Sequence, residues 1–297
     1  MSEKKSNSLA AKKHIGALKT EASEPKNIIG VFDSGLGGLT VLKDLLDKLP
    51  QYNYIYLGDN ARVPYGEKSQ ETIYNFSLEA VDYLFSHGAN LIIIACNTAS
   101  SQALRKLQQK YLPKHYPNRR ILGVILPLVE ELINKNHKKI GIIGTKATIN
   151  SKAYEIELHK LNPELKVENM SAPLLVPLIE EGWAKKPETR MILKKYLKPL
   201  KTKQIDALIL GCTHYPFLYE EIKKAMGRRI SVPHPGKIIA QSLEKYLQRH
   251  PELGLKPEKN PDYRFLSTDE PALFKELGEK FLGQKMAKIE KVKISKI

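Results

Sequence analysis

The stretch LIIIACNTAS at residues 91–100 is an apolar, largely β-branched run that ends at a cysteine and a polar turn. The segment ALILGCTHYP at 207–216 repeats this pattern. Such a run, followed by a polar turn and a helical pattern, is typical of a buried parallel strand. The carboxyl end of such a strand lies at the sheet edge where open α/β folds bind ligands. Because Cys96 and Cys212 are the chain's only two cysteines, we predict two thiols that face one site.

Strands and helices alternate along the rest of the chain. Ordered structure is expected to begin with a strand at 28–32, a glycine-rich turn at 33–38 and a helix over 39–49. Further strands are expected at 52–57, 91–95, 121–126, 139–144 and 207–211, with a last one near 291–294. Strands that alternate with helices of ten or more residues favour mainly parallel sheets with helices on both faces.

The spacing of corresponding turns suggests two related halves. Asp33 precedes Cys96 by 63 positions, and Thr145 precedes Cys212 by 67. We therefore predict two similar α/β domains with mainly parallel sheets, related by pseudo-two-fold symmetry, with the active site in the cleft between them. Residues 28–120 and 237–297 are assigned to the first domain, residues 121–236 to the second, and residues 1–27 to a mobile basic extension.

The composition is that of a globular protein, with 42% hydrophobic and 27% charged residues among 297. No apolar run approaches the roughly 20 residues needed to span a bilayer, and the N-terminus lacks the apolar core of a signal peptide. Two cysteines cannot form a disulfide framework. We therefore expect a cytoplasmic protein with reduced thiols and no membrane partner.

The net charge of +16 is unusually high. Residues 1–27 carry six lysines against three glutamates, and residues 278–297 carry six lysines against two glutamates, so the two ends account for seven of the sixteen charges. Such a charge can attract nucleic acid, or it can simply keep a lysine-rich surface solvated. Without interleaved aromatic residues or a recognised module, the solvated surface is favoured. We do not expect nucleic acid as the main partner.

The two thiols allow several chemical interpretations. Each cysteine alone is more often a buried structural residue than a reactive one. The chain has no CxxC pair, which argues against a zinc site, and the reducing compartment disfavours a disulfide. A nucleophilic cysteine with His214 would leave the other thiol without a task. A proton-transfer pair would use both thiols. One sulfur would remove a proton and the other would return one on the opposite face, which suits inversion of a carbon centre.

Other polar residues follow the strands. Ser34, Asn97, Thr98 and Thr213 could donate hydrogen bonds to a substrate carboxylate. Asp33 could orient an ammonium group or assist a thiol, or it could cap a helix.

Three further positions carry weaker local signals. His214 could tune Cys212 or be hydrogen-bonded in a loop. Glu180 could partner His214 or lie on a solvated face. Tyr65-Gly66 lies in a loop of the kind that contacts ligands.

Five ordered motifs carry a family resemblance. They are GVFDSGLGG at 30–38, LGD at 57–59 with PYG at 64–66, ACNTA at 95–99, VPLIEEG at 176–182 and LGCTHYP at 210–216. In these motifs the chain resembles the glutamate racemases of the cofactor-independent aspartate/glutamate racemase family. In having a histidine after Cys212-Thr213, the chain resembles the glutamate racemases of this family rather than the aspartate racemases. A racemase of aspartate or another amino acid, and a polyanion-binding protein built on a racemase scaffold, are the alternatives.

The resemblance implies roles for individual residues. Cys96 corresponds to the base that takes the proton from D-glutamate, and Cys212 to the base that takes it from L-glutamate. Asp33 and His214 correspond to their assistants, with Glu180 supporting His214. The substrate-contacting pairs correspond to Asp33-Ser34, Tyr65-Gly66, Asn97-Thr98 and Thr213-His214.

The resemblance also implies a setting for the reaction. It implies an isomerase that works without cofactor or metal, forms a homodimer and supplies D-glutamate for peptidoglycan, and hence for cell-wall biogenesis and cell shape. Some members are activated by UDP-N-acetylmuramoyl-L-alanine, although residues 1–27 match no motif of theirs. The segment VPHPG at 232–236 departs from the family pattern and leaves contacts there open.

Overall fold

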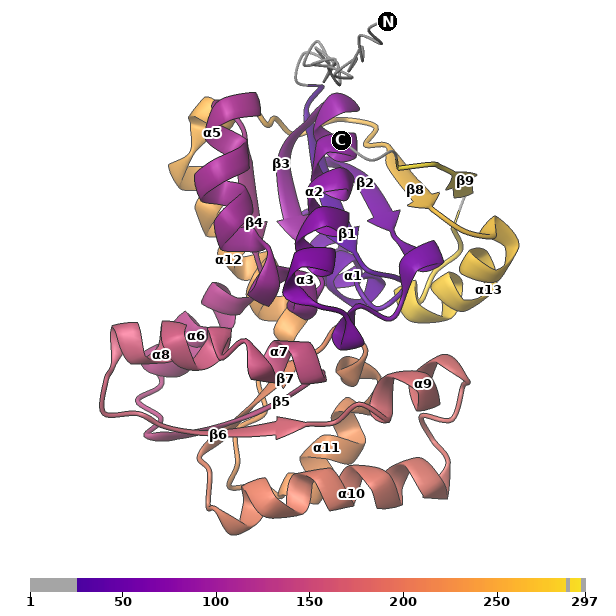
Figure 1. Ribbon diagram of the computed structural model, residues 1–297. Helices are drawn as coiled ribbons and strands as arrows, with labels where there is room; N and C mark the ends of the chain where they lie inside the picture. Colours follow the sequence, from indigo (N-terminus) through magenta and orange to yellow (C-terminus); the bar gives the residue numbers. More distant parts are fainter. Residues whose placement is uncertain (1–25, 287–288, 295–297) are drawn as a thin grey trace, which may run out of the picture.

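The strands of this protein form two sheets in which every pairing is parallel, as judged from a computed structural model that describes residues 26–286 and 289–294. The larger sheet has the order β4-β3-β1-β2-β8-β9 and the smaller one the order β6-β5-β7. Figure 1 shows the larger sheet in the upper part of the molecule and the smaller sheet in the lower part. The strands are β1 Ile28–Asp33, β2 Asn53–Gly58, β3 Ala89–Ile94, β4 Arg120–Gly123, β5 Lys139–Gly144, β6 Lys166–Ser171, β7 Ala207–Gly211, β8 Tyr263–Ser267 and β9 Ile289–Lys291.

The two sheets share one pattern of connections. In the larger sheet β1 lies between β2 and β3, and in the smaller sheet β5 lies between β6 and β7. An isolated parallel β-bridge pairs Ser231 with Ala207 of β7. It lies beside β7 in the position that β4 has beside β3 in the larger sheet. Thus β1 corresponds to β5, and the cysteine strand β3 corresponds to the cysteine strand β7. The two domains differ in size, however, because the larger sheet carries additional strands.

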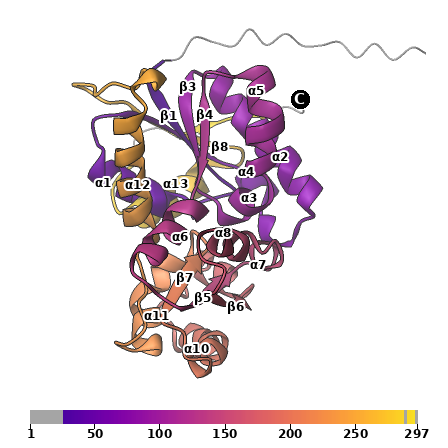
Figure 2. The same cartoon turned by 90° about the vertical axis from the view of Figure 1, so that its left-hand side faces the viewer.

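Helices cover both sheets (Figures 1 and 2). They are α1 Leu39–Lys48, α2 Gln70–Ser86, α3 Asn97–Gln102, α4 Leu104–Lys106, α5 Leu112–His115, α6 Ile125–Asn134, α7 Lys146–Asn150, α8 Ala153–Leu161, α9 Leu175–Glu180, α10 Pro187–Thr202, α11 Tyr219–Met226, α12 Pro235–Arg249 and α13 Pro271–Leu282.

Helix α12 returns the chain to the larger domain. It packs along α1 and also contacts α6, as the side view of Figure 2 shows. Helix α1 buries Leu42 and Leu45 and other apolar residues of one face, so the α1–α12 pair forms an apolar layer on the sheet. Beyond α12, β8 pairs with β2, and β9 lies at the edge of the larger sheet.

The boundary expected at residue 121 is wrong. Strand β4 covers Arg120–Gly123 and pairs with β3, so it belongs to the larger sheet. The expected strand over 121–126 is cut short because Ile125 already begins α6, with Pro127 in its first turn. A proline is tolerated there, since the first amides of a helix have no intrahelical acceptor.

The end of the chain shows smaller differences. The last strand covers Ile289–Lys291 rather than 291–294, although it is an edge strand as expected. Most of the predicted N-terminal extension, residues 1–25, lies outside the described residues. Across the described part of the chain, no helix combines the length and the apolar character that crossing a bilayer requires.

Candidate active site

Both cysteines lie where their strands end. Cys96 follows β3, caps helix α3 and accepts a hydrogen bond from the Ala99 amide at 3.5 Å. Cys212 follows β7 directly. Both are free thiols, and their exposed fractions are only 5% and 6%. Because β3 and β7 belong to different sheets, each domain contributes one sulfur.

The two sulfur-bearing residues line one cavity between the domains, with a volume of about 310 Å³. Its lining contains every predicted site residue except Asp33, namely Ser34, Tyr65, Gly66, Cys96, Asn97, Thr98, Glu180, Cys212, Thr213 and His214. Side chains that are up to 180 positions apart in the sequence are thereby brought into one small space. The cavity is the predicted shared cleft.

The surroundings of Cys96 favour a protonated thiol. Its Sγ lies 3.3 Å from Ser34 Oγ. Burial and the nearby Asp33 carboxylate raise the pKa of Cys96 to about 12, although the Ser34 hydroxyl and the Ala99 amide oppose that rise. At neutral pH this sulfur therefore holds its proton.

Cys212 has a cationic neighbour. The Nδ1 atom of His214 lies 3.9 Å from Cys212 Sγ, and its Nε2 atom lies 3.0 Å from Glu180 Oε1. Burial alone would disfavour the charged ring, but these two partners raise the pKa of His214 to about 10. The imidazolium donates one N–H toward the sulfur and the other to the carboxylate. The ring therefore places a positive charge beside the Cys212 sulfur.

Asp33 lies just behind the cavity and is fully buried. The Gly35 amide donates to its Oδ2 at 2.9 Å, and the Thr213 hydroxyl donates to its Oδ1 at 3.3 Å. Burial raises the pKa of Asp33, while His214 and these hydrogen bonds oppose the rise. Asp33 thus links β1 to the Cys212 turn of the other domain, and its neighbour Ser34 is the residue that contacts Cys96.

The Tyr65-Gly66 loop is held from behind. The Tyr65 hydroxyl donates to Asp59 Oδ2 at 2.5 Å, and Arg62 Nε donates to the same oxygen at 2.7 Å. The hydroxyl of Tyr65 is therefore already engaged, while the Tyr65-Gly66 loop lines the cavity. A Cβ added at Gly66 would lie 3.0 Å from Thr145 Cβ, so this loop approaches the second domain closely.

Three residues that sequence reasoning did not select for the site, Thr145, Thr148 and Tyr154, take part in hydrogen bonds between the domains. Thr98 Oγ1 lies 2.9 Å from Thr145 Oγ1, which in turn lies 2.9 Å from Thr148 Oγ1. The Tyr154 hydroxyl donates to Asn97 Oδ1 at 2.6 Å.

Two residues of the cavity that were not predicted as site residues carried a signal in the sequence. Thr145 and Lys146 also line the cavity. They stand at the turn after β5 that corresponds to the Asp33 turn after β1, so the repeat could have identified them. Within residues 26–286 and 289–294, no group of three or more His, Cys, Asp or Glu side chains is placed to hold a metal ion.

The chain is similar to glutamate racemases over nearly its whole length. The sequence model of the Asp/Glu/hydantoin racemase family matches residues 34–243. The glutamate racemase of Neisseria meningitidis serogroup B is 43% identical over 267 residues, which are 90% of this chain and 96% of that protein. That of Geobacter metallireducens is 38% identical over 272 residues, 91% of this chain and 98% of that protein.

Solved structures agree. Glutamate racemase isoform RacE1 of Bacillus anthracis superimposes with a TM-score of 0.83 at 36% identity, covering 90% of this chain and 97% of that one. The Francisella tularensis enzyme, solved in complex with D-glutamate, gives a TM-score of 0.82 at 38% identity, covering 91% of this chain and 98% of that one.

Proposed function

The chain belongs to the Asp/Glu/hydantoin racemase family, and on this premise we propose that it is a glutamate racemase that exchanges the Cα proton of glutamate between two opposed sulfur atoms. The observation that carries the proposal is the single cavity of about 310 Å³ lined by Cys96 and Cys212 from different domains. A base on one face of Cα and an acid on the other are what inversion without a cofactor requires.

The neighbours of the two sulfurs suggest how the reaction starts from L-glutamate. Cys212, beside the His214 imidazolium, acts as thiolate and removes the Cα proton. The Cys96 thiol then delivers its own proton to the opposite face, which yields D-glutamate, a Cys96 thiolate and a Cys212 thiol. The reverse reaction starts from that second state, so Cys96 is the base toward D-glutamate.

Neighbouring groups assist the two sulfurs. His214 holds charge on Cys212, and Glu180 holds His214 in its charged form through the 3.0 Å contact. On the other side, Ser34 donates to Cys96 when the sulfur is ionised. We assign Asp33 to the orientation of this turn and of the substrate ammonium.

The substrate is held by small polar groups on both domains. Ser34, Asn97, Thr98 and Thr213 offer hydroxyl and amide groups to the two carboxylates. The Tyr65-Gly66 loop closes one side. Thr145 and Lys146 add a hydroxyl and a positive charge from the second domain. Fixed donors in a water-poor site stabilise the charge that develops when Cα loses its proton.

The wider setting follows from the same proposal. The enzyme works as a homodimer in the cytoplasm, where the thiols stay reduced, and supplies D-glutamate for peptidoglycan.

We divide the chain by sheet membership, with residues 28–123 and 235–294 in the first domain and residues 124–234 in the second. UDP-N-acetylmuramoyl-L-alanine is retained as a predicted activator, and an unchanged rate on its addition would remove it.

A chiral assay tests the proposal. Purified protein, dialysed against a chelator and free of pyridoxal phosphate, should convert L-glutamate to the racemic mixture and should act far more slowly on aspartate. Turnover that depends on an added cofactor, or a preference for aspartate in the same panel, would contradict it.

A further inference from the structure

Half of the net positive charge of this protein lies in one internal segment. Residues 182–229 contain twelve Lys and Arg residues against four Asp and Glu residues, an excess of eight out of the net +16. With the seven excess charges of the chain ends, this leaves the remainder of the sequence close to neutral. A lysine-rich surface kept only for solubility would spread its charge more evenly.

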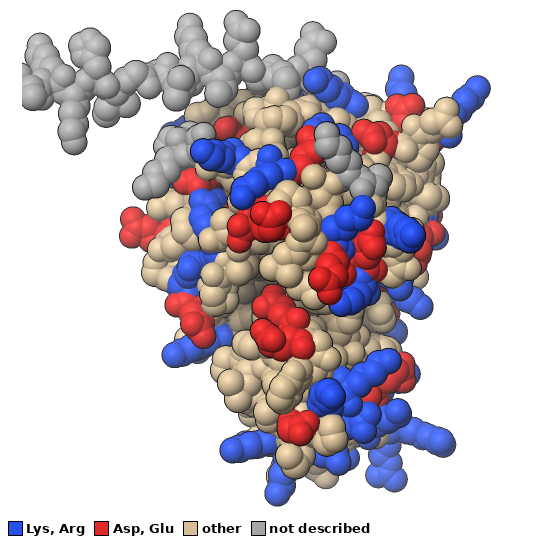
Figure 3. Space-filling view, turned by 90° about the vertical axis from the view of Figure 1, so that its right-hand side faces the viewer, with Lys and Arg blue, Asp and Glu red and all other residues tan. Residues whose placement is uncertain are grey.

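Two helices of this segment, α10 and α11, lie at one end of the molecule. Helix α10 carries Arg190, Lys194, Lys195, Lys198 and Lys201, all of them exposed. Helix α11 packs against α10 and adds exposed cations, with more in the turn that follows it, namely Lys223, Lys224, Arg228 and Arg229. We call these nine residues the basic end. Figure 3 shows Lys and Arg gathered at the bottom of the molecule, where Figure 1 places α10 and α11.

The cations of the basic end have little internal compensation. Among the described residues, the ion pairs that involve this end are limited to Arg190 with Glu221, at 4.0 Å. Elsewhere cations are paired more closely, as in Lys48 with Glu244 at 3.0 Å and Arg62 with Asp59 at 2.7 Å. Neighbouring unpaired cations repel one another, and a bound polyanion would relieve that repulsion.

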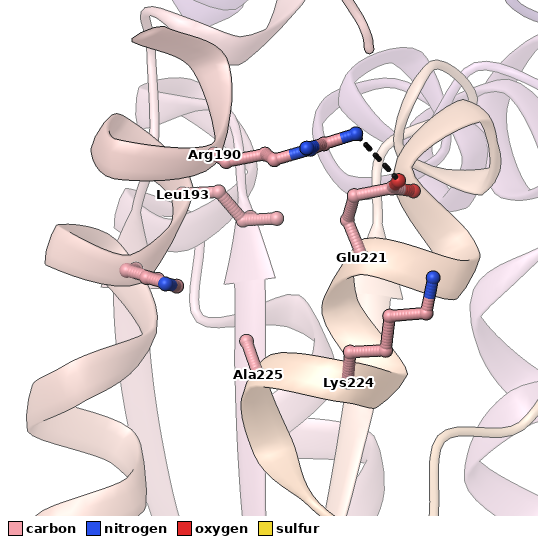
Figure 4. A pocket seen from close by; sticks show the side chains of 6 residues that line it. Arg190, Leu193, Glu221, Lys224 and Ala225 are labelled. Atoms are coloured by element: carbon pink, nitrogen blue, oxygen red, sulfur yellow. Dashed lines mark ion pairs between the residues drawn. The ribbon is translucent and has the colours of Figure 1, made fainter. Parts of the chain in front are cut away.

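The surface between the two helices is concave. A cavity of about 350 Å³ lies there, with Arg190 and Lys194 on the α10 side and Lys224 on the α11 side. Figure 4 shows Arg190 reaching across to Glu221 at one end of this groove, with Lys224 on the opposite wall. Cations therefore face the groove from both sides, which suits a strand-like anion better than a flat surface.

The spacing along α10 fits a linear partner. Arg190, Lys194, Lys198 and Lys201 recur about once per turn, so they form one row of about 16 Å at a rise of 1.5 Å per residue. A strand of duplex DNA presents a phosphate about every 3.4 Å of its axis. Such a row can follow several consecutive phosphates.

We propose that the basic end binds the phosphodiester backbone of nucleic acid, without reading its sequence, as a second function separate from the cleft between the domains. Contacts to phosphate position a protein on nucleic acid but carry no base information. A lipid bilayer with anionic headgroups shares this charge, but its flat surface cannot enter the groove.

The test uses the full-length protein and a fluorescently labelled 20-base-pair duplex, with binding followed by anisotropy across a salt series. The variant Lys194→Gln/Lys198→Gln/Lys224→Gln removes three cations from α10 and α11. A matched control, Lys4→Gln/Lys5→Gln/Lys12→Gln, removes three from the N-terminal extension. We expect the first variant to weaken binding at least about tenfold near 0.15 M salt and to lower the salt slope by up to roughly 2.7, since each phosphate contact contributes about 0.9.

The remaining outcomes decide the proposal. A duplex of scrambled sequence should bind equally, and both variants should racemise glutamate at the parental rate, which shows that they are folded. Equal or greater loss in the control variant would assign binding to the N-terminal extension and overturn the proposal. Retention on vesicles of anionic lipid without binding of the duplex, or no binding at 0.15 M salt, would overturn it as well.

Discussion

At the scale of single residues, the two sulfur atoms occupy unlike environments. Cys96 lies near the Asp33 carboxylate, and its pKa is raised to about 12. Cys212 lies 3.9 Å from a histidine whose pKa is raised to about 10. Burial and the Asp33 carboxylate hold the proton on Cys96, and a cationic ring faces Cys212. We propose that the exchange starts from a Cys96 thiol and a Cys212 thiolate. A two-base exchange needs this arrangement, since two thiols could not start it and two thiolates could not finish it.

Replacing either sulfur should stop the reaction. Cys96→Ala and Cys212→Ala should each lower kcat for both directions by roughly 10²- to 10⁴-fold, because each removes one of the two proton-transferring groups. A chiral assay in both directions measures this. Near-normal turnover in either variant, with the fold intact by circular dichroism, would disprove the two-base assignment.

The contact between His214 and Glu180 should appear in the pH dependence of stability. Against the effect of burial, contacts with Cys212 and with Glu180 raise the pKa of His214 above its ordinary 6.5, to about 10. Folding therefore favours the protonated ring, and this stabilisation is complete below about pH 6.5 and lost as the pH rises toward 10. Glu180→Gln should lower the free energy of unfolding by on the order of 1 kcal/mol at neutral pH, with the difference from the parent vanishing above pH 10.

Urea unfolding at several pH values checks this expectation. The adjacent Glu181→Gln is the matched control, because Glu181 is exposed and its side chain makes no hydrogen bond to any residue that the structure describes. A difference that is the same at pH 7 and at pH 10.5, or an equal effect in the control, would show that Glu180 does not hold the proton on His214.

At the scale of elements, the turns that follow the strands join the domains. The glycine-rich turn after β1 lies directly against the Cys212 turn. A Cβ built at Gly37 would lie 2.3 Å from Thr213 Oγ1 and 2.5 Å from His214 Nδ1. No side chain fits there unless one of the two turns moves.

Gly37→Ala should therefore damage catalysis more than folding. We expect kcat/KM to fall by about 100-fold, because a displacement of about 1 Å at a reacting group has that scale of effect. Gly254→Ala is the comparison. Gly254 has φ of +68° and nothing within 4 Å of a built Cβ, so that variant should lose roughly 1 kcal/mol of stability and keep its activity. Steady-state kinetics and thermal unfolding of both variants test the contrast, and equal activities would contradict it.

A hydrogen bond also joins α8 to the Cys96 turn. Tyr154 is buried, and its hydroxyl donates to Asn97 Oδ1 at 2.6 Å. Tyr154→Phe leaves that buried oxygen without its donor, which should cost about 1–3 kcal/mol of stability. Because Asn97 also lines the cavity, KM for glutamate should rise while the variant stays folded. An unchanged KM would show that this hydrogen bond does not position Asn97 for the substrate.

At the scale of the whole molecule, the sequence predicts which functional residues stand at strand ends better than it predicts the domain boundaries. The apolar runs before Cys96 and Cys212, and the glycine-rich turn after β1, were sufficient to place these residues at strand ends. The boundary at residue 121 is wrong because an apolar run from Ile121 to Leu126 contains both the end of β4 and the start of α6. Hydrophobicity alone does not separate a buried strand from a buried helical turn.

Contacts between distant segments could not be predicted from local patterns. The pairing of Tyr154 with Asn97 depends on how the two domains pack, and so does the row of hydroxyls from Thr98 to Thr148. The basic end is a similar case. Its lysines are visible in the sequence, but their gathering on two adjacent helices is apparent only when α10 and α11 are seen side by side.

The most direct test of two sulfurs acting on opposite faces is an isotope measurement at early turnover. L-glutamate is incubated with the enzyme in deuterated water, and both enantiomers are recovered before about a tenth has reacted. In a two-base exchange, one sulfur removes the proton from one face of Cα. The other sulfur, whose proton has exchanged with solvent, delivers deuterium to the opposite face. The early product should therefore be D-glutamate with one deuterium at Cα, while the recovered L-glutamate should contain almost none. Deuterium appearing in both enantiomers at equal early rates would mean that one base serves both faces, and it would contradict the account.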